Sequence, residues 1–320
     1  MNRIVAVLGA VVLIAPAAQA QQVQVDASIP AYQKTSGVSG NLSSVGSDTM
    51  NNLMTLWGEA FAKMYPNVKI QVEGKGSSTA PPALIAGTAQ FGPMSRAMRG
   101  TEIDQFEAKF GYKPTQLRTS YDALAVYVNK DNPLDKATLA EIDGAFSKSR
   151  RRGGKNVGTW GGLGLTGDWA SRPISLYGRN SASGTYGFFK EHVLQNGDYK
   201  DQVKEQPGSA SVVQGVTADR FGMGYSGIGY KTSGVKNLSL AAKAGDAYSN
   251  GSYEDVVSSK YPLARFLYIY VNKAPGKELD PVAREFLKLV FSREGQEIVV
   301  KDGYYPLTAK IVQEEVAKLR

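Results

Sequence analysis

Apolar and polar positions alternate with two different periods along the chain. Short β-prone runs are followed by stretches whose apolar residues recur every three or four positions, which is typical of helices. The pattern predicts strands at 42–45, 68–72, 89–91 and 174–177, and helices at 50–64, 81–86, 101–110 and 186–194. Strands that alternate with helices in this way predict βαβ units and a largely parallel sheet in an α/β fold.

Two apolar segments, 123–130 and 266–273, resemble each other. Both end in Val-Asn-Lys, and a proline follows each of them shortly afterwards. They are either the two crossings of a chain between two lobes or two unrelated buried strands, and periodicity does not separate these interpretations. As crossings, they place residues 38–122 and 266–320 in lobe one and residues 123–265 in lobe two.

The N-terminus has the three parts of a signal peptide. Arg3 precedes an apolar run at 4–14, and Ala18-Gln19-Ala20 forms a small-x-small cleavage site. The alternatives are a membrane anchor or a core helix, but the run is shorter than the roughly 20 residues that span a bilayer. We therefore predict a signal peptide at 1–20, cleaved after Ala20. Residues 21–37 are polar without periodicity and predict an N-terminal arm.

The amino-acid composition narrows the possible cellular location of the protein and its possible binding partners. The chain has no cysteine, so it has no disulfide, no thiolate metal ligand and no lipidated cysteine anchor. We therefore predict an exported protein that is kept in the periplasm. The net charge of +8 is compatible with nucleic acid, an acidic surface or a small anion. Nucleic acid is disfavoured because the basic residues are spread along the chain, apart from a glycine-flanked cluster at 150–155 that is typical of a surface loop.

Three small, hydroxyl-rich turns lie where a predicted strand ends and a helix begins, at 46–50, 74–82 and 179–185. At such positions free backbone N–H groups and the positive end of the helix dipole favour an oxyanion. Any one turn is more often explained by ordinary N-capping. Three of them favour an oxyanion site, because Arg179 in the third can hold an oxyanion with two parallel hydrogen bonds.

These residues resemble the phosphate-binding protein of the bacterial phosphate-specific ABC transporter, the PstS family. The resemblance runs from about residue 38 to the end and rests on six motifs in the right order: Gly46-Ser47-Asp48-Thr49, Gly76-Ser77-Ser78-Thr79, Phe91-Gly92-Pro93-Met94-Ser95-Arg96, Trp160-Gly161-x-Leu163-Gly164, Arg179-x-x-x-Ser183-Gly184-Thr185 and Gly222-Met223-Gly224-Tyr225. It implies a type II periplasmic-binding-protein fold, with two α/β lobes joined by two crossover strands and a ligand cleft between them. It further implies a monomer without cofactor that captures inorganic phosphate and delivers it to ABC transporter permease subunits in the inner membrane.

The resemblance also implies which residues bind phosphate. They lie in four of the motifs or, for Met50, directly after the first: Ser47, Asp48, Thr49, Met50, Ser77, Ser78, Thr79, Ser95, Arg179, Ser183, Gly184 and Thr185. Met50 would contribute through its backbone N–H. The segment from Arg179 to Thr185 matches the family motif without gaps.

The chain departs from the family at Ser95–Arg96, where many members have an aspartate that accepts the proton of hydrogen phosphate. Sulfate carries no proton, so an acceptor separates the two anions by about 1–3 kcal/mol. We expect Asp48 to take this role, with Asp122 as the reserve candidate. The alternative is that Asp48 only caps its helix.

Enzyme functions find little support in the sequence. His192 is the only histidine, which disfavours zinc sites and a Ser-His-Asp triad. Gly222-x-Gly224-x-x-Gly227 matches a dinucleotide fingerprint, but no helix is predicted after it to receive a pyrophosphate. We expect a binding protein and not an enzyme. The alternatives are a secreted phosphatase or other phosphoryl-transfer enzyme, and a binding protein for another oxyanion such as sulfate.

Overall fold

The computed structural model describes residues 23–320 and has a mixed α/β fold. The predicted signal peptide and its cleavage site lie outside the described residues. Within 23–320, none of the helices combines the length and the apolar character that crossing a membrane requires.

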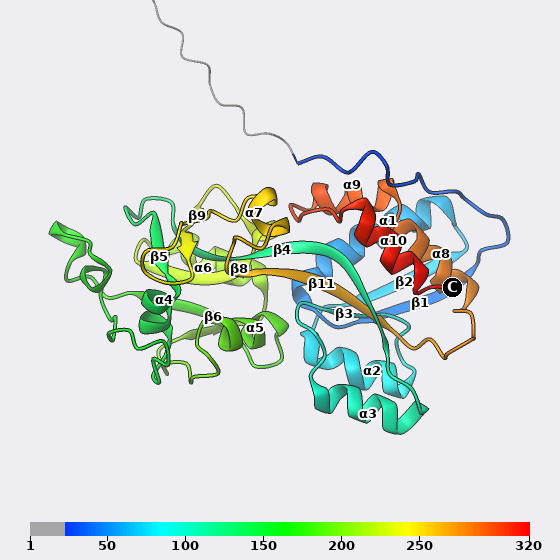
Figure 1. Cartoon of the computed structure of the whole chain (residues 1–320), viewed down its shortest axis with the longest axis horizontal. Helices are drawn as coiled ribbons and strands as arrows, with labels where there is room; N and C mark the ends of the chain where they lie inside the picture. Colours follow the sequence, from blue (N-terminus) through cyan, green and yellow to red (C-terminus); the bar gives the residue numbers. More distant parts are fainter. Residues whose placement is uncertain (1–22) are drawn as a thin grey trace, which may run out of the picture.

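Two groups of elements lie at opposite ends of the long axis, and we call them the first and second lobes (Figure 1). The first lobe contains β1 (Gly40–Val45), β2 (Val68–Glu73), β3 (Gly92–Met94), α1 (Asn51–Met64), α2 (Ala80–Ala86), α3 (Gly100–Phe110), α8 (Pro281–Val290), α9 (Arg293–Lys301) and α10 (Ala309–Ala317). The second contains β5 (Lys136–Thr138), α4 (Leu139–Phe146), β6 (Ser175–Arg179), α5 (Gly184–His192), β7 (Lys204–Gln206), α6 (Ser209–Ala218), β8 (Gly222–Gly227), β9 (Val235–Asn237), β10 (Ser239–Ala241) and α7 (Tyr253–Val257).

Two strands connect the lobes, β4 (Thr115–Asn129) and β11 (Ala264–Val271), and they pair antiparallel (Figure 1). β11 continues into the first lobe by pairing with β3, and β4 continues into the second by pairing with β8 and β9. A seven-stranded sheet of order β3-β11-β4-β8-β6-β7, with β9 beside β4, therefore runs through both lobes.

The prediction of a largely parallel sheet was wrong, because the sheet is mixed. In the seven-stranded sheet, parallel pairs occur between β6 and its neighbours β7 and β8. The other parallel pairs, β1 with β2 and β5 with β10, form two separate two-stranded sheets. Every pair made by β4 or β11 is antiparallel. The reason is that the chain crosses between the lobes once in each direction, so the two connecting strands run opposite ways.

The Val-Asn-Lys similarity does not mark equivalent positions in the fold. Asn129 pairs with Val235 at the second-lobe end of β4. Asn272 follows Val271, which pairs with Thr115 at the first-lobe end of β11. The two motifs thus lie at opposite ends of the connecting strands.

The predicted helices and most strands are confirmed, and the apolar spacing explains why. In α1, Leu53, Trp57 and Phe61 are four residues apart and fully buried, so one face of the helix packs into the first-lobe core. β3 begins at Gly92, after the predicted 89–91, because its partner is the distant segment Tyr268–Tyr270 of β11. Local periodicity does not reveal that pairing.

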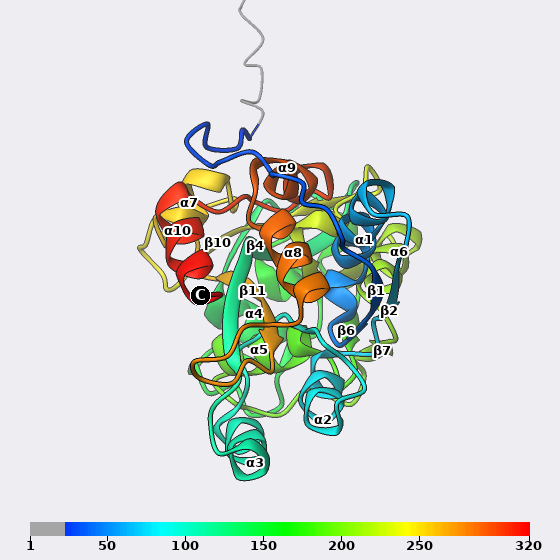
Figure 2. The same ribbon diagram turned by 90° about the vertical axis from the view of Figure 1, so that its right-hand side faces the viewer.

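The N-terminal arm is docked on the first lobe, where it runs past α9 toward β1 (Figure 2). The side chain of Ile29 is fully buried, and the Arg293 guanidinium donates to the carbonyls of Ala27 and Ile29. The backbone N–H of Tyr32 donates to Glu294 at 2.7 Å. A segment without periodicity is held here by backbone groups and single side chains.

Candidate functional site

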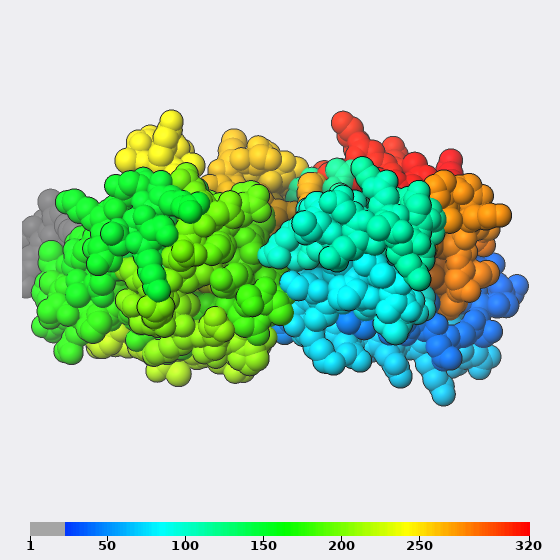
Figure 3. Space-filling view, turned by 90° about the horizontal axis from the view of Figure 1, so that it is seen from below, coloured from blue at the N-terminus to red at the C-terminus, as the bar shows by residue number. Residues whose placement is uncertain are grey.

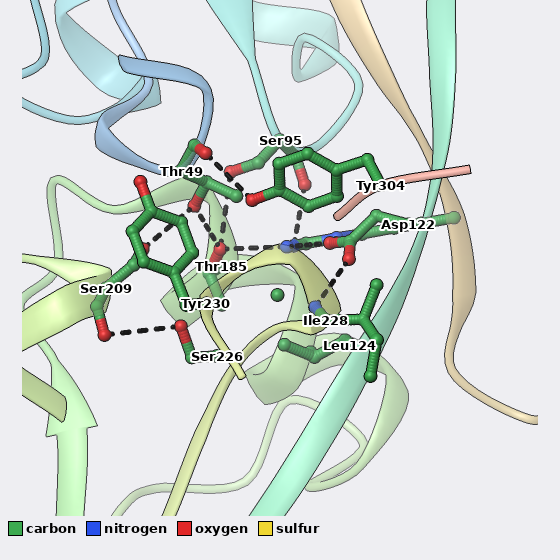
Figure 4. Close-up of polar contacts among 12 residues, drawn as sticks. Thr49, Ser95, Asp122, Leu124, Thr185, Ser209, Ser226, Ile228, Tyr230 and Tyr304 are labelled. Carbon is green, nitrogen blue, oxygen red and sulfur yellow. Dashed lines mark hydrogen bonds and ion pairs between the residues drawn. The ribbon is translucent and has the colours of Figure 1, made fainter. Parts of the chain in front are cut away.

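Buried hydroxyl groups from both lobes meet where the lobes touch (Figure 4). Thr185 Oγ1 of the second lobe lies 2.9 Å from Thr49 Oγ1 and 3.4 Å from Ser95 Oγ, which both belong to the first lobe. Ser77 Oγ lies 3.3 Å from Ser95 Oγ, and Ser209 Oγ lies 3.4 Å from Thr49 Oγ1. We call these five residues, Thr49, Ser77, Ser95, Thr185 and Ser209, the hydroxyl cluster.

Four of the cluster residues lie at the start of a helix. Thr49 belongs to the 3₁₀ turn Asp48–Met50 that opens into α1, and Ser77 begins the 3₁₀ turn before α2. Thr185 lies in the first turn of α5, and Ser209 is the first residue of α6. Helix starts carry free N–H groups and a positive partial charge, so their convergence favours an anion.

Glycine is required where the two lobes approach most closely. A Cβ atom on Gly184 would lie 2.2 Å from Ser77 Oγ and 2.7 Å from Ser95 Oγ. A Cβ atom on Gly76, whose φ is +120°, would lie 2.5 Å from the carbonyl oxygen of Ala182. Any larger residue at these positions would push the lobes apart.

Arg179 ends β6 and points into the cluster with only 2% of its side chain exposed. Its Nη1 donates to Ser209 Oγ at 2.7 Å and lies 3.1 Å from Asp48 Oδ2 in the first lobe. Burial lowers the pKa of Arg179, and the Asp48 carboxylate opposes that shift. Its Nε is buried and has no hydrogen-bond partner within residues 23–320.

Asp48 does not cap its own helix. Its Oδ2 accepts the backbone N–H of Ser209 at 2.7 Å, across the interface between the lobes. The hydroxyl of Tyr230, also in the second lobe, donates to the Asp48 carbonyl at 3.0 Å. The capping alternative is therefore wrong, and Asp48 connects the two lobes.

A second buried ion pair joins Arg265 and Asp122 beside the cluster. From the sequence, Asp122 was named only as the reserve proton acceptor, and Arg265 was missed. Arg265 Nη2 donates to Thr185 Oγ1 at 3.1 Å, and its Nη1 donates to the Ser95 carbonyl at 2.9 Å. Arg265 is the only charged residue of β11, and Asp122 directly precedes the apolar run 123–128 of β4. That pattern could have indicated them, because a buried charge is normally paired.

Ser209 was also missed, although its local sequence carries the same signal as the predicted turns. Gly208 follows the short strand β7 and caps α6, and Ser209 is the first residue of that helix. Small residues between a strand and a helix were the criterion for the other turns. The three-residue length of β7 hid the pattern.

Most of the remaining predicted residues use their polar groups to hold the turns and the segments beside them, although the buried Ser47 Oγ has no partner within residues 23–320. The N–H groups of Ser47 and Met50 donate to the carbonyls of Pro93 and Ser47, respectively. Thr79 Oγ1 donates to the Gly76 carbonyl, and Ser183 Oγ caps α5 by accepting the N–H of Tyr186. Across the interface, the N–H of Ser78 donates to the Ala182 carbonyl at 3.1 Å. The contacts of these five residues fix the shape of the turns and the position of one lobe against the other.

A cavity of about 560 Å³ opens beside the cluster, between the first-lobe segment after β3 and α5. Its lining includes Arg96, Arg99, Lys190, His192 and Arg265, so the same Arg265 that contacts Thr185 also faces this cavity. The face on which α2, α3 and α5 lie is the one shown in Figure 3, where the two lobes meet along a seam.

The site thus combines hydroxyls, backbone N–H groups and two guanidiniums with two carboxylates. Within 23–320, no group of three or more His, Cys, Asp or Glu side chains could hold a metal ion. Donors of this kind surround a tetrahedral oxyanion without requiring a metal.

Comparison with known proteins agrees with this geometry. Residues 31–294 match the family model of the PBP superfamily domain. The phosphate-binding protein PstS of Pseudomonas aeruginosa is 57% identical over 92% of each chain. The chain belongs to the PstS family of phosphate-binding proteins.

A more distant PstS relative agrees with this membership, and a solved structure agrees with the fold. The PstS protein of Staphylococcus haemolyticus is 27% identical over 88% of this chain and 85% of its own length. The structure of an ABC-type phosphate transport receptor from Vibrio cholerae has a TM-score of 0.64, with 19% identity, and covers 83% of this chain and 100% of its own. The predicted PstS resemblance and the type II periplasmic-binding-protein fold are confirmed.

Proposed function

We propose that this chain captures inorganic phosphate between its lobes and delivers it to the permease subunits of an ABC transporter. The identity of 57% with the P. aeruginosa phosphate-binding protein supports this function. The observation that carries it is the buried hydroxyl cluster, into which Arg179 brings a guanidinium whose Nε has no partner within the described residues. A phosphate oxygen would supply that partner.

The relatives also decide between binding and catalysis. They are named as phosphate-binding proteins, which confirms the prediction of a binding protein over an enzyme.

By this function the protein works outside the cytoplasm, and we propose that it acts as a monomer in the periplasm. Fractionation of cells into periplasmic and cytoplasmic extracts would test that location.

Within the predicted set, we propose direct phosphate contacts for the residues that the structure brings together: Asp48, Thr49, Ser77, Ser95, Arg179, Gly184 and Thr185. We add Ser209, because Arg179 and Thr49 both contact its hydroxyl. For Ser47, Met50, Ser78, Thr79 and Ser183, we propose that they hold the turns in which those contacts lie.

Asp48 is the proposed acceptor of the phosphate proton. Its Oδ2 is occupied by Ser209 N–H and Arg179, whereas its Oδ1 accepts no hydrogen bond from residues 23–320. A carboxylate oxygen with free lone pairs can take the proton of hydrogen phosphate, which sulfate does not offer. This preference supports phosphate over sulfate as the ligand.

We propose that residues 38–122 with 266–320, and residues 123–265, move as two units. Opening would separate the contacts across the interface, such as Thr49 with Thr185 and Tyr230 with Asp48. The connecting strands β4 and β11 would bend near the Asp122–Arg265 position, where both strands pass between the lobes.

Titration calorimetry on the mature chain, beginning at Gln21, tests the function directly. We expect one phosphate per chain and sulfate binding at least about 100-fold weaker, because sulfate leaves Asp48 without a proton to accept. Sulfate that bound as tightly as phosphate would favour the other-oxyanion alternative. Sustained turnover of a chromogenic phosphate ester, with or without divalent metal, would favour the phosphatase alternative.

A further inference from the structure

An ion pair joins the middle of β4 to the start of β11. Arg265 of β11 and Asp122 of β4 are direct cross-strand partners, and their side chains are 2% and 0% exposed. Arg265 Nε lies 2.8 Å from Asp122 Oδ2, and its Nη2 lies 2.7 Å from the same oxygen. Burying such a pair costs about as much as the attraction returns, so strand stability alone does not explain it.

The remaining N–H groups of Arg265 reach one residue in each lobe. Nη1 donates to the Ser95 carbonyl at 2.9 Å, and Nη2 donates to Thr185 Oγ1 at 3.1 Å. A guanidinium can only donate, so the Thr185 hydroxyl must accept this bond. The single proton of Thr185 is then directed to another acceptor, which in the cluster is a neighbouring hydroxyl or a bound anion.

Asp122 is fully engaged in holding this arrangement. Its Oδ1 accepts the N–H of Ile228 at 3.0 Å (Figure 4). Its Oδ2 accepts the Nε–H of Arg265. The guanidinium therefore stands between the Asp122 carboxylate and Thr185, with its positive charge beside the hydroxyl cluster. Asp122 orients Arg265, and Asp48 is left as the carboxylate with a free oxygen.

We propose that Arg265 is a second cationic contact of the phosphate site, supplied by the connecting strands, and that Asp122 is its positioning residue. This inference rests on the proposed function, which it deepens. Because Arg265 contacts Ser95 and Thr185 together, its full set of hydrogen bonds exists only when the lobes are closed. Arg265 therefore links lobe closure to the charge of the captured anion.

Calorimetric titration of phosphate and sulfate into the mature chain and four variants tests the proposal, with small-angle scattering to follow closure. We expect Arg265→Gln to weaken phosphate binding about 30-fold and to leave the phosphate-bound protein more open. Arg265→Lys keeps the charge but loses the planar fork, so it should lose about fivefold to tenfold. This partial rescue distinguishes a charge contact from a purely structural one.

Asp122→Asn gives the sharpest result because two explanations predict opposite signs. Removing a negative charge near an anion would by itself tighten binding. As a positioning residue, Asp122 should instead weaken phosphate and sulfate by the same factor, about tenfold. The double variant Arg265→Gln/Asp122→Asn leaves no unpaired buried charge, so it keeps the question testable if a single variant does not fold.

Arg118→Gln is the matched control. Arg118 lies on β4, as Asp122 does, and it pairs with Glu315, whose side chain is fully buried. It has no contact with the hydroxyl cluster. It should lower thermal stability without changing phosphate affinity.

Three results would overturn the proposal. Phosphate affinity within threefold of the wild type in Arg265→Gln or the double variant removes Arg265 from the site. Tighter binding in Asp122→Asn, or a loss for phosphate alone, removes the positioning role. The wild-type titration is read first: if the wild type binds no phosphate, the proposed function itself fails and the inference fails with it.

Discussion

The two arginine–aspartate pairs at the site differ in what they join. Arg179 and Asp48 belong to different lobes, so their pair exists only while the lobes touch. Arg265 and Asp122 lie on paired strands, and their pair persists in any arrangement of the lobes that preserves the strand pairing. Asp48 is 23% exposed, whereas Asp122 is fully buried. The Arg179–Asp48 pair can therefore stabilise the closed state, whereas the Arg265–Asp122 pair keeps its guanidinium at the same place in the open and closed states.

Arg179→Gln should have the largest effect on this comparison. The substitution removes a buried guanidinium and leaves Asp48 without its cation, so we expect phosphate affinity to fall at least about 100-fold. Calorimetric titration measures the loss. Arg220→Gln is the control, because Arg220 packs over the Trp169 ring and has no contact with the cluster. A loss below threefold in Arg179→Gln would mean that the interlobe pair does not hold the anion.

Asp48→Asn should change the selectivity for phosphate over sulfate more than it changes the affinity for sulfate. An asparagine can still accept the N–H of Ser209 but offers a weaker acceptor to the phosphate proton. We expect the ratio of phosphate to sulfate affinity to fall about tenfold. Paired titrations with the two anions measure that ratio, and an unchanged ratio would exclude Asp48 as the acceptor.

Tyr230→Phe should weaken phosphate binding about fivefold, because it removes one interlobe hydrogen bond, worth about 1 kcal/mol. Tyr304→Phe is a matched control. The Tyr304 hydroxyl donates to the Thr49 carbonyl at 2.9 Å, so this bond is made within the first lobe. The control should lower thermal stability and leave affinity unchanged. Equal effects on affinity would show that the bond across the interface has no special part in closure.

The smallest expected effect comes from Asp302, which lies near Tyr230 and accepts a hydrogen bond from Asn52. Burial raises the pKa of Asp302 from 3.8 to about 6, and the Asn52 bond only partly opposes this. Between these values the folded protein holds a proton that the unfolded chain releases. Stability should therefore fall as pH rises from about 4 to about 6, by roughly 1 kcal/mol because the group is partly exposed.

Asp302→Asn removes this titration. Thermal unfolding measured from pH 4 to pH 7 should then give a flatter profile, and the variant should exceed the wild type in stability at pH 7. A variant whose profile keeps the slope of the wild type would assign the pH dependence to another group. Phosphate affinity at pH 7 should stay unchanged.

Local sequence signals predicted the part of the site around Arg179 and Asp48 well. A small hydroxyl residue between a strand and a helix favours a helix start, because this preference depends on neighbouring residues alone. The turns that contain Thr49, Ser77, Thr185 and Arg179 were found in this way, and the structure brings these residues together. The helices and most strands followed from apolar periodicity for the same short-range reason.

The Arg265–Asp122 pair depended on tertiary structure. Arg265 and Asp122 are far apart in the sequence, and only the antiparallel pairing of β4 and β11 makes them neighbours. The same pairing made the sheet mixed, although local alternation of strands and helices predicted a parallel one. The sequence by itself determined where helices begin and which hydroxyls they present. Only the tertiary structure decided which charges meet, because strand pairing between distant segments depends on the burial of both strands together.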